Sequence, residues 1–360
     1  MVTAHARQQS DPPAEGVEML WRLPKVELHL HLVGAIRPAT VCAQARRYAP
    51  DSPFCHDDWQ AGFWSFSDLT TALAALRQVT QIVLRSADDY YLVARECFED
   101  LAAQQVIYAE VSVGQPKHPP GHPHYVSLPD TLAAIEQARR EVEARTSLRV
   151  GLILGLSRGP EDASVSARAC QWVEQAVAAR DRGAVVVGVD LHGDEQTFPS
   201  PQPFVAAFRL AAQAGLGRRA HAGEAAGATS VWDCLHQLDV QRIAHGVRAV
   251  EDPTLVAHLA QAGVVLDVCP TSNVWTGLAP SVAAHPIRAL HEAGVRVTVS
   301  SDDPLLMATT VTEELGHLHR DLGFSLRDLG RFMVTAAAQS FQPAAVRATL
   351  VRTLQDTWPS

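Results

Sequence analysis

The stretch Lys25-Val-Glu-Leu-His-Leu-His-Leu32 decides the fold, because apolar and polar residues alternate strictly along it. Successive side chains of a β-strand point to opposite faces, so the valine and the leucines share one face while Glu27, His29 and His31 share the other. In a closed barrel, the apolar face would pack against surrounding helices and the polar face would point inward. The stretch therefore predicts a buried strand with two imidazoles near its carboxyl end.

Seven further strand-like runs follow, and most are separated by segments with apolar residues at helical spacing. The eight runs cover residues 25–32, 106–113, 148–155, 185–191, 217–221, 242–245, 264–269 and 295–300. Eight strand-then-helix units predict the α/β class and a closed (β/α)8 TIM barrel. An open doubly wound sheet is the structural rival, but no Gly-x-Gly-x-x-Gly motif follows any run.

More than seventy residues separate the first two runs, far more than one helix requires. Helical patterns cover residues 68–84 and 88–104 of this insertion. The aromatic residues ahead of them are Trp59, Phe63, Trp64 and Phe66. Because loops at the carboxyl ends of barrel strands build active sites, the insertion could cap a pocket as an apolar lid. Extra helices packed outside the barrel are favoured for most of it.

Composition limits the function classes. Of 360 residues, 47% are hydrophobic and 19% are charged, which allows a large core. Residues 1–20 are predicted to be a disordered lead-in, and residues 21–360 a single domain. The net charge of −9 argues against nucleic acid or an anionic membrane as a partner. Six cysteines without a C-x-x-C pair, and no apolar signal segment, predict a cytoplasmic protein with reduced thiols. Homo-oligomerisation stays open.

Four of the strand-like runs end in potential metal ligands. His29 and His31 close the first run, His221 the fifth, His245 the sixth and Asp302 follows the eighth. The carboxyl ends of barrel strands meet at one rim, so these side chains are expected to lie together. Three of these four imidazoles together with the carboxylate would be a suitable ligand set for Zn²⁺ that leaves room for a water molecule.

Two alternatives stay open for these residues. Asp303 precedes Pro304, and Asp before Pro is also typical of a helix N-cap. The second alternative is a two-metal site, because many such barrels bridge two metals with a carbamylated lysine at the end of the fourth strand. That end reads Val189-Asp-Leu-His-Gly193 and contains no lysine. The sequence therefore favours one metal ion per chain.

Six motifs together resemble the adenosine deaminase family of the amidohydrolase superfamily. They occur in the family's order between residues 23 and 304. The motifs are Leu23-Pro-Lys-Val-Glu-Leu-His-Leu-His-Leu32, Val187-Gly-Val-Asp-Leu-His-Gly-Asp-Glu195, His221-Ala-Gly-Glu224, Arg242-Ile-Ala-His-Gly-Val-Arg248, Cys269-Pro-Thr-Ser-Asn273 and Ser300-Ser-Asp-Asp-Pro304. The H-x-E and P-C-x-x-C signature of the other zinc deaminases is absent.

The resemblance implies a zinc-dependent hydrolytic deaminase that replaces the 6-amino group of an adenine nucleoside with oxygen and releases ammonia. It implies one Zn²⁺ per chain, held by His29, His31, His221 and Asp302. In the family, such a zinc ion lowers the pKa of a bound water towards neutrality.

The resemblance also implies roles for the residues around the metal. The implied catalytic residues are Glu224, which protonates N1 of the purine, His245, the base and orienting group beside hydroxide, and Asp303, which contacts N7. The implied substrate contacts are the N–H of Gly193 to N3, together with Asp303, Val33 and His31.

The chain departs from the family pattern at two positions. Nucleoside enzymes of the family commonly have Asp where this chain has Val33, and that Asp contacts the ribose 5′-hydroxyl. Valine leaves a buried hydroxyl unpaired at a cost of about 1–3 kcal/mol, so 5′-methylthioadenosine, S-adenosylhomocysteine and aminofutalosine become candidate substrates. His192 replaces a small residue and either lines the ribose end of the pocket or points outward. Arg158 is expected to be structural, with an anionic substituent as its alternative partner.

Two other functions stay open from the sequence. One is a metal hydrolase of the wider superfamily that acts on another amide, a lactone or a phosphoester. The other is a purine-binding protein without activity, which the presence of Glu224 and the full ligand set disfavours.

Overall fold

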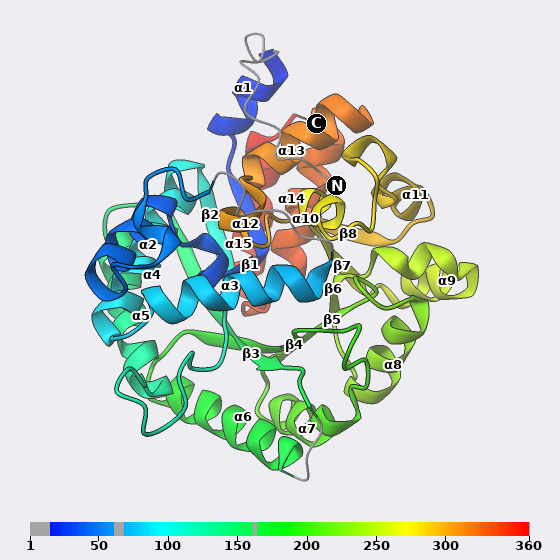
Figure 1. The fold of residues 1–360 in the computed structure, drawn as a ribbon. Coiled ribbons are helices and arrows are strands. Elements are labelled where there is room, and N and C mark those ends of the chain that lie inside the picture. The colour runs from blue at the N-terminus through cyan, green and yellow to red at the C-terminus, as the bar shows by residue number, and fades with distance from the viewer. Residues whose placement is uncertain (1–14, 61–67, 161–163, 360) are drawn as a thin grey trace.

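The computed structural model describes residues 15–60, 68–160 and 164–359. Its strands form one parallel sheet in the order β1 to β8, with helices around it (Figure 1). The strands are β1 (Lys25–His31), β2 (Val106–Val113), β3 (Arg149–Ser157), β4 (Val186–His192), β5 (Gly217–Ala222), β6 (Arg242–His245), β7 (Val265–Val268) and β8 (Arg296–Val299). The predicted (β/α)8 barrel is confirmed, and every strand begins and ends within two residues of a predicted run.

One bridge, between Leu30 and Asp302, joins the segment that follows β8 to β1. The N–H of His31 donates to the carbonyl of Asp302 at 2.9 Å, and the N–H of Asp302 donates to the carbonyl of His29 at 3.1 Å. Because the barrel closes through the backbone of Asp302, closure itself brings this carboxylate beside the two histidines of β1.

Helices cover the outer face of the barrel, where Val26, Leu28 and Leu30 are at most 1% exposed. The covering helices are α4 (Ala87–Ala103), α5 (Leu128–Glu143), α6 (Val165–Asp181), α7 (Val205–Gln213), α8 (Ala228–Leu238), α9 (Pro253–Ala262), α11 (Ile287–Glu292) and α14 (Leu326–Gln339). The remaining helices beyond β7 are α10 (Pro270–Trp275), α12 (Pro304–Met307), α13 (Val311–Leu322) and α15 (Ala344–Thr357), which packs against α14.

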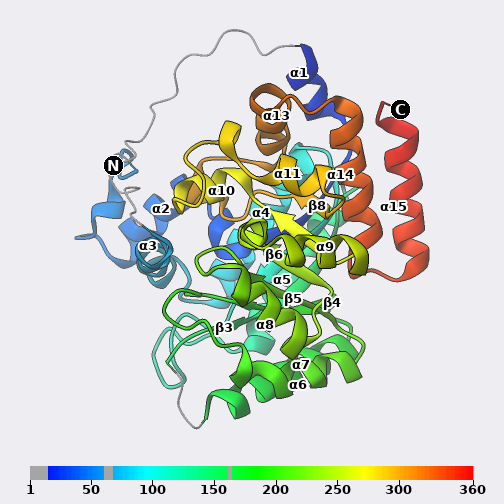
Figure 2. The same ribbon diagram turned by 90° about the vertical axis from the view of Figure 1, so that its right-hand side faces the viewer.

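The insertion after β1 contributes α2 (Pro38–Tyr48) and α3 (Leu69–Val83). In Figure 1, α3 lies in front of the strands, and Figure 2 shows α2 and α3 on the side opposite α14 and α15. Thr70 Oγ1 donates to Asp194 Oδ2 at 2.8 Å, which ties α3 to the segment after β4. This contact supports a lid role for α3, whereas α4 packs on β2 and α5 as an ordinary barrel helix.

The segment between α2 and α3 contributes aromatic side chains to a small apolar core. Trp59 is buried against Phe54, with ring centroids 5.2 Å apart. The predicted lid residues Phe63, Trp64 and Phe66 lie outside the described residues.

The predicted disorder of residues 1–20 is wrong for its last part. Residues Glu15–Arg22 form helix α1, which packs against α13 and buries Leu20 completely. An amphipathic helix of about two turns gains enough from this contact to be ordered, and composition alone does not reveal the surface it packs against. No helix of the described residues is long and apolar enough to cross a membrane.

The interior of the barrel below the rim is charged. Arg219 Nη2 donates to Ser112 Oγ at 2.6 Å and pairs with Asp190 at 3.1 Å. Arg242 pairs with Glu110 at 2.6 Å and with Asp267 at 3.1 Å. Buried guanidinium and carboxylate groups are tolerated only when paired in this way, and the pairs fix side chains that in turn hold the rim.

Candidate active site

Four of the predicted site residues bring ligand atoms to one point at the carboxyl ends of the strands. His29 Nε2 lies 3.1 Å from His221 Nε2 and 3.2 Å from Asp302 Oδ1. His31 Nε2 lies 3.3 Å from each of the same two atoms. Ligand atoms about 2.1 Å from one tetrahedral zinc ion are separated by about 3.4 Å, so these spacings fit a common metal ion.

The proton positions of the imidazoles support a cation at this point. His29 Nδ1 lies 3.3 Å from the carbonyl of Asp267, and His221 Nδ1 lies 3.1 Å from Asp190 Oδ2. Both partners accept hydrogen bonds, so each Nε2 lone pair faces the centre. Burial lowers the pKa of His29 and of His221 to about 4, so both rings are neutral at pH 7. Facing lone pairs and a carboxylate repel one another unless a cation lies between them, so the donor set fits a divalent metal.

His245 lies at the edge of the same cluster. The ligand atoms of His29, His221, His245 and Asp302 all lie within 4.8 Å of one another. However, His245 Nε2 lies 3.7 Å from Asp302 Oδ2 and 3.5 Å from Glu224 Oε2. His31 Nε2 instead lies near Asp302 Oδ1, the same oxygen that His29 Nε2 approaches. The distances therefore favour His31 as the fourth ligand and leave His245 beside it.

Backbone strain marks two of these positions. His245 and Asp302 have φ angles of 61° and 63°, in the left-handed region that non-glycine residues rarely adopt. Such a conformation costs on the order of 1–3 kcal/mol and persists only where the surrounding structure imposes it. The surrounding structure therefore holds the backbone of these two residues in a strained conformation.

Glu224 is held by a second carboxylate that the sequence analysis did not identify. Glu195 Oε2 accepts hydrogen bonds from the backbone N–H groups of Glu224 and of the next two residues at 2.8–3.1 Å. Its Oε1 accepts from the N–H of Gly223 at 2.7 Å and from the hydroxyl of Ser230. Five donors on one buried carboxylate fix the turn after β5, and therefore the position of Glu224.

The charge state of Glu224 suits an acid. Burial raises the pKa of Glu224 well above its usual value, and the carboxylates of Asp302, Glu195 and Asp303 raise it further. A raised pKa favours the protonated form of the carboxyl group, which is the form that can give a proton to a substrate.

Asp303 presents a buried oxygen without a protein partner. Its Oδ1 makes no hydrogen bond to any of the described residues, although the residue is only 9% exposed. Burial and the neighbouring Asp302 raise the pKa of Asp303 to about 7. An unpaired buried oxygen is costly, so a polar ligand atom is the expected partner. Asp303 does occupy the N-cap position of α12, as the alternative predicted, but its side chain makes no capping hydrogen bond to that helix.

Gly34 leaves the space that Asp303 occupies. A Cβ at residue 34 would lie 1.8 Å from Asp303 Oδ1 and 2.6 Å from Asp303 Cα. We expect Gly34→Ala to displace Asp303 and to lower kcat/KM about 100-fold, because a displacement of about 1 Å in a positioned group costs this much. Metal content is expected to stay unchanged. Gly159→Ala, where a Cβ meets nothing within 4 Å, is the matched control. Full activity of Gly34→Ala would contradict the close approach.

The structure settles the direction of His192. Its ring lies 5.7 Å from the ring of His31 at an angle of 20°, and its Nε2 lies 3.2 Å from Ser157 Oγ. The side chain therefore points into the barrel mouth beside a predicted metal ligand. Gly193 follows it, and Val33 lies in the turn after β1, partly buried against the core.

Arg158 has a structural role, as the sequence analysis favoured. Its guanidinium donates to the carbonyls of Phe198 and Pro199 at 3.1 and 2.8 Å, and to the carbonyl of His221 at 3.0 Å. These bonds tie the segment after β4 to the end of β5. Asp190 was not predicted as a site residue, although strand alternation two residues before His192 is a signal that could have identified it.

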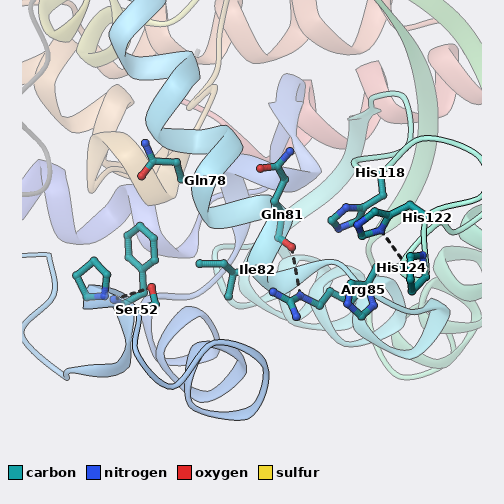
Figure 3. Close-up of a pocket in the computed structure, with 11 residues that line it drawn as sticks. Ser52, Gln78, Gln81, Ile82, Arg85, His118, His122 and His124 are labelled. Carbon is teal, nitrogen blue, oxygen red and sulfur yellow. Dashed lines mark hydrogen bonds between the residues drawn. The ribbon is translucent and has the colours of Figure 1, made fainter.

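Two cavities border α3. One of about 380 Å³ has Glu224 in its wall, together with Leu69 at the start of α3 and Val247 after β6. The other, of about 680 Å³, lies between α3 and the segment before α5 and is lined by residues that include His118, His122 and His124 (Figure 3). Across the described ranges, these three histidines do not bring their ligand atoms together as a metal site does.

Comparison with known proteins gives the family. The family model for adenosine deaminase matches residues 24–357. An adenine deaminase of Rhizobium leguminosarum bv. trifolii (strain WSM2304) is 35% identical over 340 residues, which cover 93% of this chain and 100% of the relative. An adenine deaminase of Rhizobium meliloti (strain 1021) is 37% identical over 342 residues, which cover 93% and 99% of the two chains.

Solved structures agree with these relatives. The adenine deaminase from Arthrobacter aurescens superposes with a TM-score of 0.84 at 28% identity, covering 93% of this chain and 98% of that one. An amidohydrolase from Burkholderia ambifaria with bound Zn superposes with a TM-score of 0.83 at 28% identity, covering 98% and 97%. The chain belongs to the adenosine deaminase family of the amidohydrolase superfamily, and it is a hydrolytic purine deaminase.

Proposed function

We propose that the protein is a zinc-dependent deaminase that converts free adenine to its 6-oxo product with release of ammonia. The observation that carries the chemistry is the convergence of the Nε2 atoms of His29, His31 and His221 with Asp302 Oδ1, beside the carboxyl group of Glu224, whose pKa burial raises. Curated relatives at 34–37% identity that are named adenine deaminases support adenine as the substrate.

Four residues would hold the metal: His29, His31, His221 and Asp302. A zinc ion bound there would act as a Lewis acid that makes hydroxide available from water near neutral pH. Support for zinc comes from the mixed imidazole and carboxylate donors and from the bound Zn of the Burkholderia ambifaria relative.

The protein groups around this point would activate and orient the purine. Glu224 would donate its proton to N1, which makes C6 electrophilic. The unpaired Asp303 Oδ1 would contact N7, and the N–H of Gly193 would donate to N3. Water adds its oxygen at C6, and the 6-amino group leaves with one of the protons of water. The other proton returns to the Glu224 carboxylate, so atoms and charges balance.

The substrate end of the site favours a free base. The ring of His192 lies beside His31 in the barrel mouth, which corresponds to the alternative in which His192 lines the ribose end of the pocket. Val33 also offers no acceptor to a 5′-hydroxyl. The second candidate is an adenine nucleoside with an apolar 5′-substituent, which Val33 alone would favour. Both observations disfavour adenosine itself, because its ribose would meet His192 and its 5′-hydroxyl would find no acceptor at Val33.

We expect purified wild-type protein to release ammonia from adenine with a higher kcat/KM than from adenosine or its three 5′-substituted analogues. His192→Ala is expected to raise the adenosine-to-adenine ratio of kcat/KM about 10-fold or more, because removal of a steric clash changes discrimination by about this factor. Ser157→Ala, which removes the hydrogen bond and keeps the ring, is the control. A wild-type preference for any nucleoside would refute adenine as the substrate.

A further inference from the structure

Asn273, the last residue of the Cys-Pro-Thr-Ser-Asn motif, is completely buried behind His245. Its N–H donates to the carbonyl of Cys269 at 3.0 Å, and its own carbonyl accepts from the N–H groups of Leu278 and Ala279 at 2.9 and 3.0 Å. The backbone is therefore fixed on both sides, and the amide group has a defined position between two histidines.

The first of these histidines, His285, has a defined proton position. The N–H of Ile287 donates to His285 Nδ1 at 3.1 Å, so Nδ1 carries a lone pair and the ring proton is on Nε2. Burial lowers the pKa of His285 to about 4, and the ring is therefore neutral at pH 7. Its Nε2–H lies 3.0 Å from Asn273 Oδ1 and donates to it.

The orientation of the Asn273 amide determines which ring nitrogen of His245 carries the proton. With Oδ1 committed to His285, Nδ2 is the atom that lies 3.2 Å from His245 Nδ1. An amide nitrogen can only donate, so His245 Nδ1 must accept and its ring proton is on Nε2. That Nε2–H points towards Glu224 Oε2 at 3.5 Å and Asp302 Oδ2 at 3.7 Å, into the site.

We propose that His285 and Asn273 are positioning residues that fix the tautomer of His245, so that its Nε2–H donates to the oxygen that attacks C6. His245 then holds and orients this oxygen, and it does not take a proton from it at Nε2. This inference rests on the proposed function. It replaces the role of base that the family resemblance implied for His245, and it assigns a task to a motif that the metal and substrate contacts leave unused.

Two substitutions of Asn273 separate this role from a structural one. Asn273→Asp keeps the shape, but both oxygens accept, so His245 would carry its proton on Nδ1 and turn a lone pair towards the site. Asn273→Leu removes the hydrogen bonds without imposing the wrong tautomer. We expect kcat at pH 8 to fall about 100-fold or more for Asn273→Asp, because a wrong histidine tautomer can cost up to about 10⁴-fold. For Asn273→Leu we expect a loss of about 10-fold.

Three controls complete the experiment. Ser272→Ala removes a neighbouring buried hydroxyl that has no partner among the described residues, and is expected to leave kcat unchanged. In a His245→Ala background, Asn273→Asp is expected to cause no further loss, since residues that act as a unit are not additive. Zinc content is measured for every variant.

The relative losses of activity of Asn273→Asp and Asn273→Leu distinguish a positioning role of Asn273 from a structural one. A structural role predicts that isosteric Asn273→Asp is milder than Asn273→Leu, and that order would overturn the inference, as would a full additional loss in the His245→Ala background. Absence of deamination by the wild-type holoenzyme would instead refute the proposed function, so the two failures are distinguishable.

Discussion

Glu224→Gln is expected to lose about 10³-fold or more in kcat while it keeps its zinc. The amide fits the cavity that the protonated carboxyl group occupies and can still donate a hydrogen bond, but it has no proton to transfer to N1. General acid catalysis contributes about 10²–10⁴-fold, and the carboxyl group of Glu224, whose pKa is raised well above its usual value, lies 3.5 Å from His245 beside the proposed metal site.

The measurement is ammonia release from adenine at saturating substrate, with zinc content determined on the same samples. Glu251→Gln is the matched control, because Glu251 lines the same cavity but pairs with Arg248 at 2.6 Å. Its kcat is expected to stay within about two-fold of wild type, since exposed ion pairs contribute little. A Glu224→Gln variant with more than one tenth of wild-type activity would show that another group protonates the purine.

Removal of the metal is expected to abolish activity and to lower the melting temperature. The Nε2 atoms of His29 and of His31 each lie 3.1–3.3 Å from His221 Nε2 and from Asp302 Oδ1 in a buried site. Without a cation, the lone pairs of His29 and His221 and the carboxylate of Asp302 repel one another. A ligand that binds only the folded state stabilises it by about 4 kcal/mol at 1,000 times its Kd. Dialysis against a chelator, followed by addition of one equivalent of Zn²⁺, tests both effects.

Single histidine variants then locate the metal. His221→Ala is expected to lose zinc and activity together. His118→Ala, in the separate histidine cluster of Figure 3, is expected to keep one zinc per chain. Two zinc ions per wild-type chain, or full activity after complete metal removal, would contradict the single-metal proposal.

Local sequence determined the strands and the identity of the groups at their ends. Alternation of period two along residues 25–32 is a property of a strand by itself, and it put His29 and His31 on the inner face. The eight-fold recurrence of strand and helix then implied a rim where strand ends meet, so His221, Asp302 and Glu224 could be grouped without knowledge of any contact.

Contacts between distant segments were beyond the reach of the sequence. Glu195 fixes Glu224 across 29 positions, and His285 acts through Asn273 on His245, because loops from neighbouring strands meet only once the barrel has closed. The sequence around Glu195 and around Asn273 shows no periodic pattern that would reveal which residues these two side chains contact.

The direction of His192, the helical order of residues 15–22 and the place of α3 were likewise set by tertiary packing. Local pattern determines which face of a strand or helix a residue occupies, since that depends only on backbone geometry. Which partner meets that face depends on how the whole chain closes on itself, and only the folded barrel decides it.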